Sequence, residues 1–179
     1  MTHAHPTDSF GSLVEPATLR IQRRLPGPIE RVWSYLIDSE LRAQWLAAGE
    51  MDLRAGGGVE FVWRNDELSD SAAGRPPEFA EEMRMHCPIT AVRAPHCLCF
   101  LWQGGGEVRF NLEDQGDAVL LTVTHQRLTD RASRTMVGAG WHMHLDILVA
   151  RLQGRPRPSF WEGWASLREA YDQRLPVEA

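Results

Sequence analysis

The sequence predicts an α+β protein in which antiparallel strands follow one another along the chain and helices are segregated to one side. Residues 18–25 alternate polar and apolar side chains, as a strand with one buried face does. Strand-like segments separated by glycine turns follow from residue 49, and a helical period returns after residue 130. This order of a strand, two helices, five or six strands and a long helix favours an α+β arrangement.

Length and composition favour one domain. A chain of 179 residues that is 43% apolar and 24% charged is ordinary for a globular protein, and it can bury a core that still encloses a pocket. Residues 1–16 are polar and lack the basic start and apolar stretch of a secretion signal. We therefore expect residues 1–16 to be disordered, residues 17–179 to form a single domain, and the protein to be cytoplasmic.

Charge and residue usage argue against several kinds of function. The formal charge of −5 disfavours a nucleic-acid surface, and no apolar run approaches the roughly 20 residues that cross a membrane. All 19 basic residues are Arg, so no lysine is available for a Schiff base. Cys87, Cys97 and Cys99, beside His86 and His96, follow no standard zinc spacing, and we interpret the thiols as packed strand residues. We expect neither a metal nor another cofactor.

Two helices are expected after the first strand. Pro28 suits the first turn of a helix whose apolar residues recur at helical spacing. Asp38 and Ser39 interrupt that helix and can cap a second, short one that carries Leu41, Trp45 and Leu46. We interpret Trp33 and Trp45 as core anchors rather than ligand contacts.

The middle of the chain predicts a series of strands. We place them near residues 50–54, 57–64, 82–92, 96–103, 106–113 and 118–127. The glycine triplets at 56–58 and 104–106 are hairpin turns, because neither is followed by a helix or by the Lys-Ser/Thr pair of a phosphate loop. The polar stretch 65–81 is either a mobile loop or a lid.

The last third of the chain predicts two helices. A long helix is expected from Arg131 to Gly154, which suits its end before a proline-rich segment. An amphipathic helix follows over residues 159–175. It can cap the domain or pair with a second copy in a homodimer.

Several motifs resemble the START-like superfamily, and most closely the single-domain bacterial proteins related to the activator of the heat-shock chaperone ATPase. The motifs are Pro28, Val32 and Trp33, then Trp45, the glycine turn from Arg54 to Phe61, and Gly140, Trp141 and Leu145. The resemblance covers about residues 17–153. It implies the helix-grip fold of START, Bet v 1 and polyketide-cyclase proteins, with a curved antiparallel sheet of six to seven strands around a long C-terminal helix. It also implies a pocket for apolar or aromatic molecules, but no particular reaction.

Candidate ligand-binding residues come from both walls of that pocket. On the long helix, His142, Asp146 and Gln153 share a polar edge, which turns His144 and Arg151 toward the sheet. An inward His144 or Arg151 either bonds a carbonyl or carboxylate of the protein or orients a polar part of a ligand. His125, in phase with the apolar series of its strand, can lie at the pocket mouth. The full candidate set is Met85, Phe100, Trp102, Phe110, His125, His144, Leu148 and Arg151.

Three functions stay open. The first is binding of a small hydrophobic or aromatic molecule between sheet and helix. The second is a regulator that binds another protein, such as a chaperone ATPase, and this predicts an exposed apolar patch and little enclosed volume. The third is a polyketide cyclase or hydratase-like enzyme, which needs an acid and a base inside the cavity, for example His144 with Glu82 or Glu107. No nucleophilic triad has its expected setting, so we name no catalytic residue.

Overall fold

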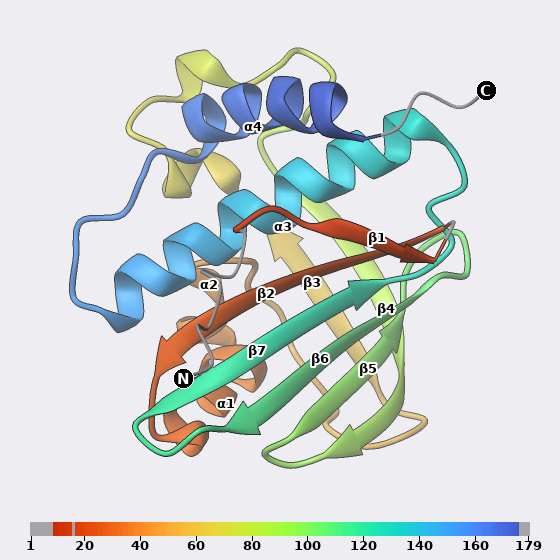
Figure 1. The fold of residues 1–179 in the computed structure, drawn as a ribbon, viewed down its shortest axis with the longest axis vertical. Helices are drawn as coiled ribbons and strands as arrows, with labels where there is room; N and C mark the ends of the chain where they lie inside the picture. The colour runs from red at the N-terminus through yellow and green to blue at the C-terminus, as the bar shows by residue number, and fades with distance from the viewer. Residues whose placement is uncertain (1–8, 16, 176–179) are drawn as a thin grey trace, which may run out of the picture.

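The computed structural model shows a seven-stranded antiparallel sheet with helices packed against it (Figure 1). It describes residues 9–15 and 17–175. The strands lie in the order β1-β2-β7-β6-β5-β4-β3. Their bounds are β1 (Ser12–Glu15), β2 (Thr18–Pro26), β3 (Gly58–Trp63), β4 (Met83–Arg93), β5 (Cys97–Leu101), β6 (Glu107–Asp114) and β7 (Ala118–His125). The sheet confirms the predicted α+β class and the helix-grip arrangement.

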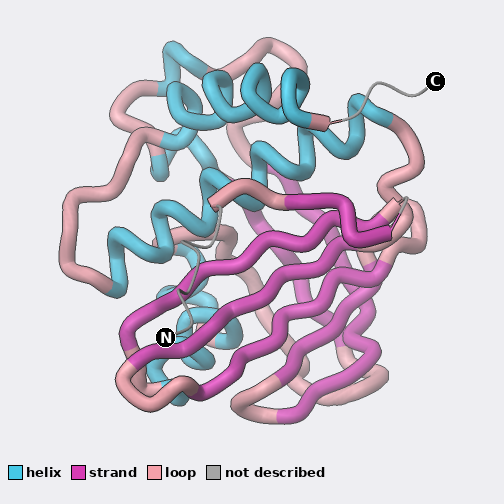
Figure 2. The backbone as a smooth tube through the Cα atoms, in the orientation of Figure 1, coloured by secondary structure: helices cyan, strands magenta, loops and turns pink. Residues whose placement is uncertain are grey.

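The two longest helices form two successive layers beside the sheet. Figure 2 shows the longest helix lying across the sheet. The last helix runs along the side of the longest helix that faces away from the sheet. The helices are α1 (Ile29–Ile37), α2 (Ser39–Ala43), α3 (Arg131–Leu152) and α4 (Phe160–Arg174), with short 3-10 turns η1 (Asn65–Leu68) and η2 (Ala72–Gly74). Helix α4 therefore caps α3 of its own chain, which is one of the two roles expected for the C-terminal segment.

Three local expectations were wrong. Residues 50–54 form no strand, only isolated bridges such as Met51 to Val59, because Gly49 bends the chain at a φ of 119° against the backbone of β3. Helix α2 ends at Ala43, so Trp45 lies beyond it. Part of the segment expected to be disordered forms β1, which pairs with β2 and so satisfies its backbone groups. Residues 1–8 and 16 lie outside the described residues.

A buried polar network fastens α4 and the N-terminal segment to α3. Arg23 on β2 forms an ion pair with Asp146 at 2.8 Å, and the other oxygen of Asp146 lies 3.3 Å from His142 Nε2. His142 Nδ1 lies 3.1 Å from the hydroxyl of Tyr171 on α4, and that hydroxyl accepts a hydrogen bond from the Gly11 amide at 2.7 Å. On the edge of α3 that we expected to be polar, His142 is thus covered and only 4% exposed, whereas Gln153 is exposed.

Arg42 is a fully buried cation that ties the end of α1 to the chain before β3. Its guanidinium donates hydrogen bonds to four backbone carbonyls, those of Leu36, Ile37, Ala47 and Gly49. The guanidinium carbon also lies 5.5 Å from the centroid of the Phe61 ring. Burial lowers the pKa of Arg42 to about 10, so the side chain stays charged at neutral pH. The carbonyls at the end of α1 favour a cation there.

Removing this cation should destabilise the fold strongly. Arg42→Met keeps the side-chain length but leaves four carbonyls without their donor, and we expect a loss of about 3–5 kcal/mol in the free energy of unfolding. Arg42→Lys should recover only part of it, because an ammonium lacks the planar fork. Urea unfolding measures both, with Arg20→Met on the exposed face of β2 as the control. An Arg42→Met variant as stable as the control would contradict this role.

Candidate ligand-binding cavity

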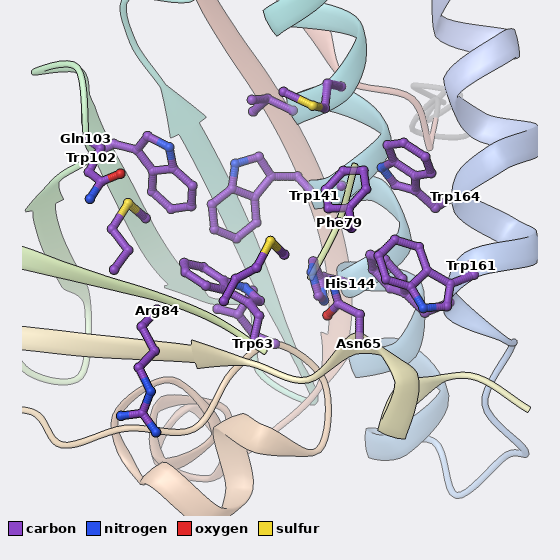
Figure 3. Close-up of a pocket in the computed structure, with 17 residues that line it drawn as sticks. Trp63, Asn65, Phe79, Arg84, Trp102, Gln103, Trp141, His144, Trp161 and Trp164 are labelled. Atoms are coloured by element: carbon purple, nitrogen blue, oxygen red, sulfur yellow. The ribbon is translucent and has the colours of Figure 1, made fainter. Parts of the chain in front are cut away.

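A cavity of about 480 Å³ opens between α3, α4 and the β3–β4 side of the sheet. Its size lies in the range of pockets that hold small organic molecules. Seven aromatic side chains line it: Trp63, Phe79, Trp102, Trp141, Phe160, Trp161 and Trp164. Three methionines, Met83, Met85 and Met136, add flexible apolar surface. Figure 3 shows Trp161 and Trp164 on the α4 side of the cavity and Trp102 on the side away from α4.

The aromatic walls are packed against one another. The Trp102 ring centroid lies 5.7 Å from that of Trp63 and 6.1 Å from that of Trp141. On the other wall, the Phe79 ring lies 5.3 Å from Trp161 and 5.2 Å from Trp164. Such tilted and edge-to-face contacts favour one arrangement of the rings, so the cavity walls are preformed.

The segment over residues 65–81, expected as a mobile loop or a lid, is fastened to α4. The Trp161 indole donates to Asp66 Oδ1 at 2.7 Å, and the Trp161 amide donates to Ser69 Oγ at 3.1 Å. Arg157, in the turn before α4, donates to the carbonyl of Leu68 at 2.8 Å. These contacts make the segment a wall of the cavity and bring Asn65 and Phe79 to it.

His144 projects from the middle of α3 and is held by a backbone group. Its Nδ1 lies 2.7 Å from the carbonyl oxygen of Trp45. A carbonyl only accepts, so Nδ1 carries the proton and Nε2 presents a lone pair. Burial lowers the pKa of His144 to about 4, so the ring is neutral at neutral pH. Of the partners that we considered for this residue, the structure shows the carbonyl.

Asn65 is the second buried polar group on the cavity lining. It begins η1, separated from the end of β3 by Arg64, and is 6% exposed. Its Oδ1 is buried and has no hydrogen-bond partner among the described residues. No pattern in the sequence pointed to Asn65, because its position depends on how the 65–81 segment packs.

His125 lies behind the cavity wall rather than at a mouth, so the expected rim position was wrong. Its Nδ1 accepts a hydrogen bond from the Trp141 indole at 3.1 Å, and the residue is 2% exposed. Burial lowers the pKa of His125 to about 4. A neutral imidazole that accepts this bond holds the Trp141 ring in place against the cavity.

Comparison with known proteins agrees with this geometry. Residues 26–153 match the family model described as activator of Hsp90 ATPase homolog 1-like protein. The chain belongs to this family. No curated protein matches the chain.

Solved structures of similar proteins share the fold. The protein encoded by gene BPP1335 of Bordetella parapertussis is 33% identical, with a TM-score of 0.76 over 95% of this chain and 94% of that one. CalU16 of Micromonospora echinospora is 25% identical, with a TM-score of 0.62 over 87% and 86%. The conserved protein EF2215 of Enterococcus faecalis is 18% identical, with a TM-score of 0.68 over 93% and 90%, and shows the fold alone.

The structure brings three of the eight predicted ligand-binding residues to the cavity: Met85, Trp102 and His144. Phe100, Phe110 and Leu148 are fully buried core residues behind the lining. Phe110 packs edge-on against Trp141 with ring centroids 5.6 Å apart, and the Phe100 ring lies 6.4 Å from Trp102. These core residues support the rings that face the cavity.

The inward orientation predicted for Arg151 was wrong, because the side chain is exposed. Arg151 lies in the last turn of α3, where the helix dipole and water both favour an exposed cation. Periodicity along α3 could not predict the orientation of Arg151, because the helix is buried against both the sheet and α4.

The described residues include neither a cluster of metal ligands nor a helix suited to span a membrane. No group of three or more His, Cys, Asp and Glu is arranged there to hold a metal ion. Cys97 and Cys99 lie with their sulfurs 3.5 Å apart, and Cys87 is fully buried. Among the same residues, no helix combines the length and the apolar character of a membrane span.

The buried imidazoles predict a fold that weakens in acid. The pKa of both His125 and His144 is lowered from 6.5 to about 4 in the folded state, so between these values the unfolded chain binds more protons. The stability that each contributes is complete above pH 6.5 and is lost as the pH falls toward 4, by roughly 3 kcal/mol per ring.

His144→Asn isolates one of the two rings, because its amide can still donate to the Trp45 carbonyl but does not titrate. Urea unfolding measures how much the free energy of unfolding falls between neutral pH and about pH 5. This fall should be roughly 2 kcal/mol smaller for the variant than for the wild type. Equal losses in the two proteins would show that His144 is not held neutral by burial.

Proposed function

We propose that the protein binds a small aromatic molecule in the cavity between α3, α4 and the β3–β4 side of the sheet. The observation that carries this proposal is the cavity of about 480 Å³ with seven aromatic rings on its lining. An aromatic ligand there gains both apolar burial and ring–ring contacts. The size and the aromatic lining of this cavity support the proposal.

Regulation of a chaperone ATPase by protein binding has less support. That function predicts an exposed apolar patch and little enclosed volume. The large apolar side chains that are exposed among the described residues are Val14, Leu101 and Met136. They lie on three different elements, β1, β5 and α3, and Met136 already belongs to the cavity lining.

A cyclase or hydratase-like reaction also has less support, because the expected acid–base pair is not brought together. Glu82 bonds Arg64 at 2.8 Å and Arg84 at 2.6 Å, and Glu107 bonds Thr90 and Arg109. Neither carboxylate is on the described cavity lining, where the titratable groups are a neutral His144 and the exposed Arg84 at the rim. These groups suit binding better than proton transfer.

Gly140 offers a way to close the cavity without disturbing its walls. It lies on α3 and lines the cavity, and a Cβ added there meets no atom within 4 Å. Gly140→Leu should therefore project into the open volume, while leucine also favours the helix. We expect the affinity for naphthalene, measured by isothermal titration calorimetry, to fall at least about tenfold. The melting temperature should be unchanged or higher.

Ala132→Leu is the matched control, because it introduces the same side chain at an exposed position of α3 outside this cavity. It should bind naphthalene as the wild type does. Naphthalene that binds Gly140→Leu as tightly as the wild type would refute the proposed site.

A further inference from the structure

We propose that the cavity selects a hydroxylated aromatic molecule, and that Asn65 and His144 are the residues that recognise its hydroxyl groups. This inference rests on the proposed function and adds the chemistry of the ligand's polar end. It makes Asn65 and His144 the specificity-determining pair of a cavity that is otherwise apolar.

The first observation is the unpaired oxygen of Asn65. Buried side-chain polar atoms nearly always have a hydrogen-bond partner, so each exception needs a reason. Three such atoms occur among the described residues, on Asn65, Arg75 and Thr135. Only Asn65 belongs to the lining of the aromatic cavity. A ligand atom that donates to its Oδ1 would supply the missing partner.

The second observation is the tautomer of His144. With its proton fixed on Nδ1 by the Trp45 carbonyl, the ring can only accept at Nε2, and Nε2 has no partner among the described residues. The Phe160 ring centroid lies 4.6 Å from that of the imidazole. Two acceptors, Asn65 Oδ1 and His144 Nε2, therefore belong to residues of one cavity. Figure 3 shows the Asn65 oxygen on the same side of the cavity as the His144 ring.

A lining with two neutral acceptors favours a neutral donor over a charged ligand. A carboxylate or phosphate would bring further acceptors and a negative charge, and Arg84 is exposed at the rim and already paired with Glu60 and Glu82. An ammonium would bring a full positive charge, and no carboxylate on the described lining compensates it, so its desolvation would be offset by the aromatic rings alone. A neutral hydroxyl donates a hydrogen bond without a charge to desolvate. Hydroxyls on an aromatic ring thus satisfy both the acceptors and the walls.

The pair also orients the ligand. Asn65 and His144 are each 6% exposed, whereas Gln103, Arg84 and Met136 on the same lining are exposed. The polar pair therefore lies at the inner end and the exposed residues form the rim. The ligand enters with its hydroxyls leading, and its ring body lies against Trp102 and Trp141.

The test compares naphthalene-2,3-diol with naphthalene, which have the same rings with and without two donors. Calorimetry measures both affinities for the wild type, for Asn65→Leu and for His144→Asn. Asn65→Leu retains the approximate shape, and His144→Asn retains a donor for the Trp45 carbonyl while removing Nε2. In each variant we expect the preference for the diol over naphthalene to fall about five- to tenfold, because the variant loses an acceptor that only the diol uses.

Stability separates recognition from a structural role. Because Asn65 Oδ1 has no partner within the described protein, Asn65→Leu should leave the melting temperature of the ligand-free protein unchanged or raise it. A diol preference that is unchanged in both variants, while naphthalene still binds, would overturn this inference and leave the proposed function standing. If neither compound binds the wild type, both the inference and the proposed function fail. If one variant does not fold, the other decides.

Discussion

The hydrogen bond from His144 Nδ1 to the Trp45 carbonyl is the contact on which the cavity depends. It joins the middle of α3 to the chain between α2 and β3, far apart in the sequence, at 2.7 Å. The same bond fixes the tautomer, because the carbonyl oxygen can only accept, so the single N–H of the neutral imidazole must be on Nδ1. This contact thus helps to position the long helix and leaves Nε2 as an acceptor on the cavity lining.

An apolar cavity of this size lowers stability, since side chains on its walls lack packing partners on one side. The strongest polar contacts lie away from it. Arg42 joins the end of α1 to the chain before β3, and the Arg23–Asp146–His142–Tyr171 network joins β2, α3 and α4. The Asn65 oxygen is an exception to the rule that buried polar atoms form hydrogen bonds. Such exceptions are expected at ligand-binding sites.

Periodicity predicted β2 and α1, because each has a buried face that repeats at the period of its element. Reasoning from periodicity failed where an element packs against neighbours on more than one side. His142 was expected on a polar edge of α3 and Arg151 toward the sheet, yet His142 packs against Tyr171 of α4 and Arg151 is exposed. The wall made by Phe79, Trp161 and Trp164 was beyond such reasoning, since nothing local shows that the 65–81 segment docks on α4.

The most direct test of the account is the nitrogen spectrum of the His144 ring in protein labelled with ¹⁵N-histidine. Two-bond ¹H–¹⁵N correlations distinguish the two neutral tautomers from the imidazolium. We expect a neutral ring with its proton on Nδ1 at neutral pH, and a shift of the Nε2 resonance toward that of a hydrogen-bonded nitrogen when naphthalene-2,3-diol is added. A protonated ring, a proton on Nε2, or an Nε2 resonance that the saturating diol leaves unmoved would contradict the account.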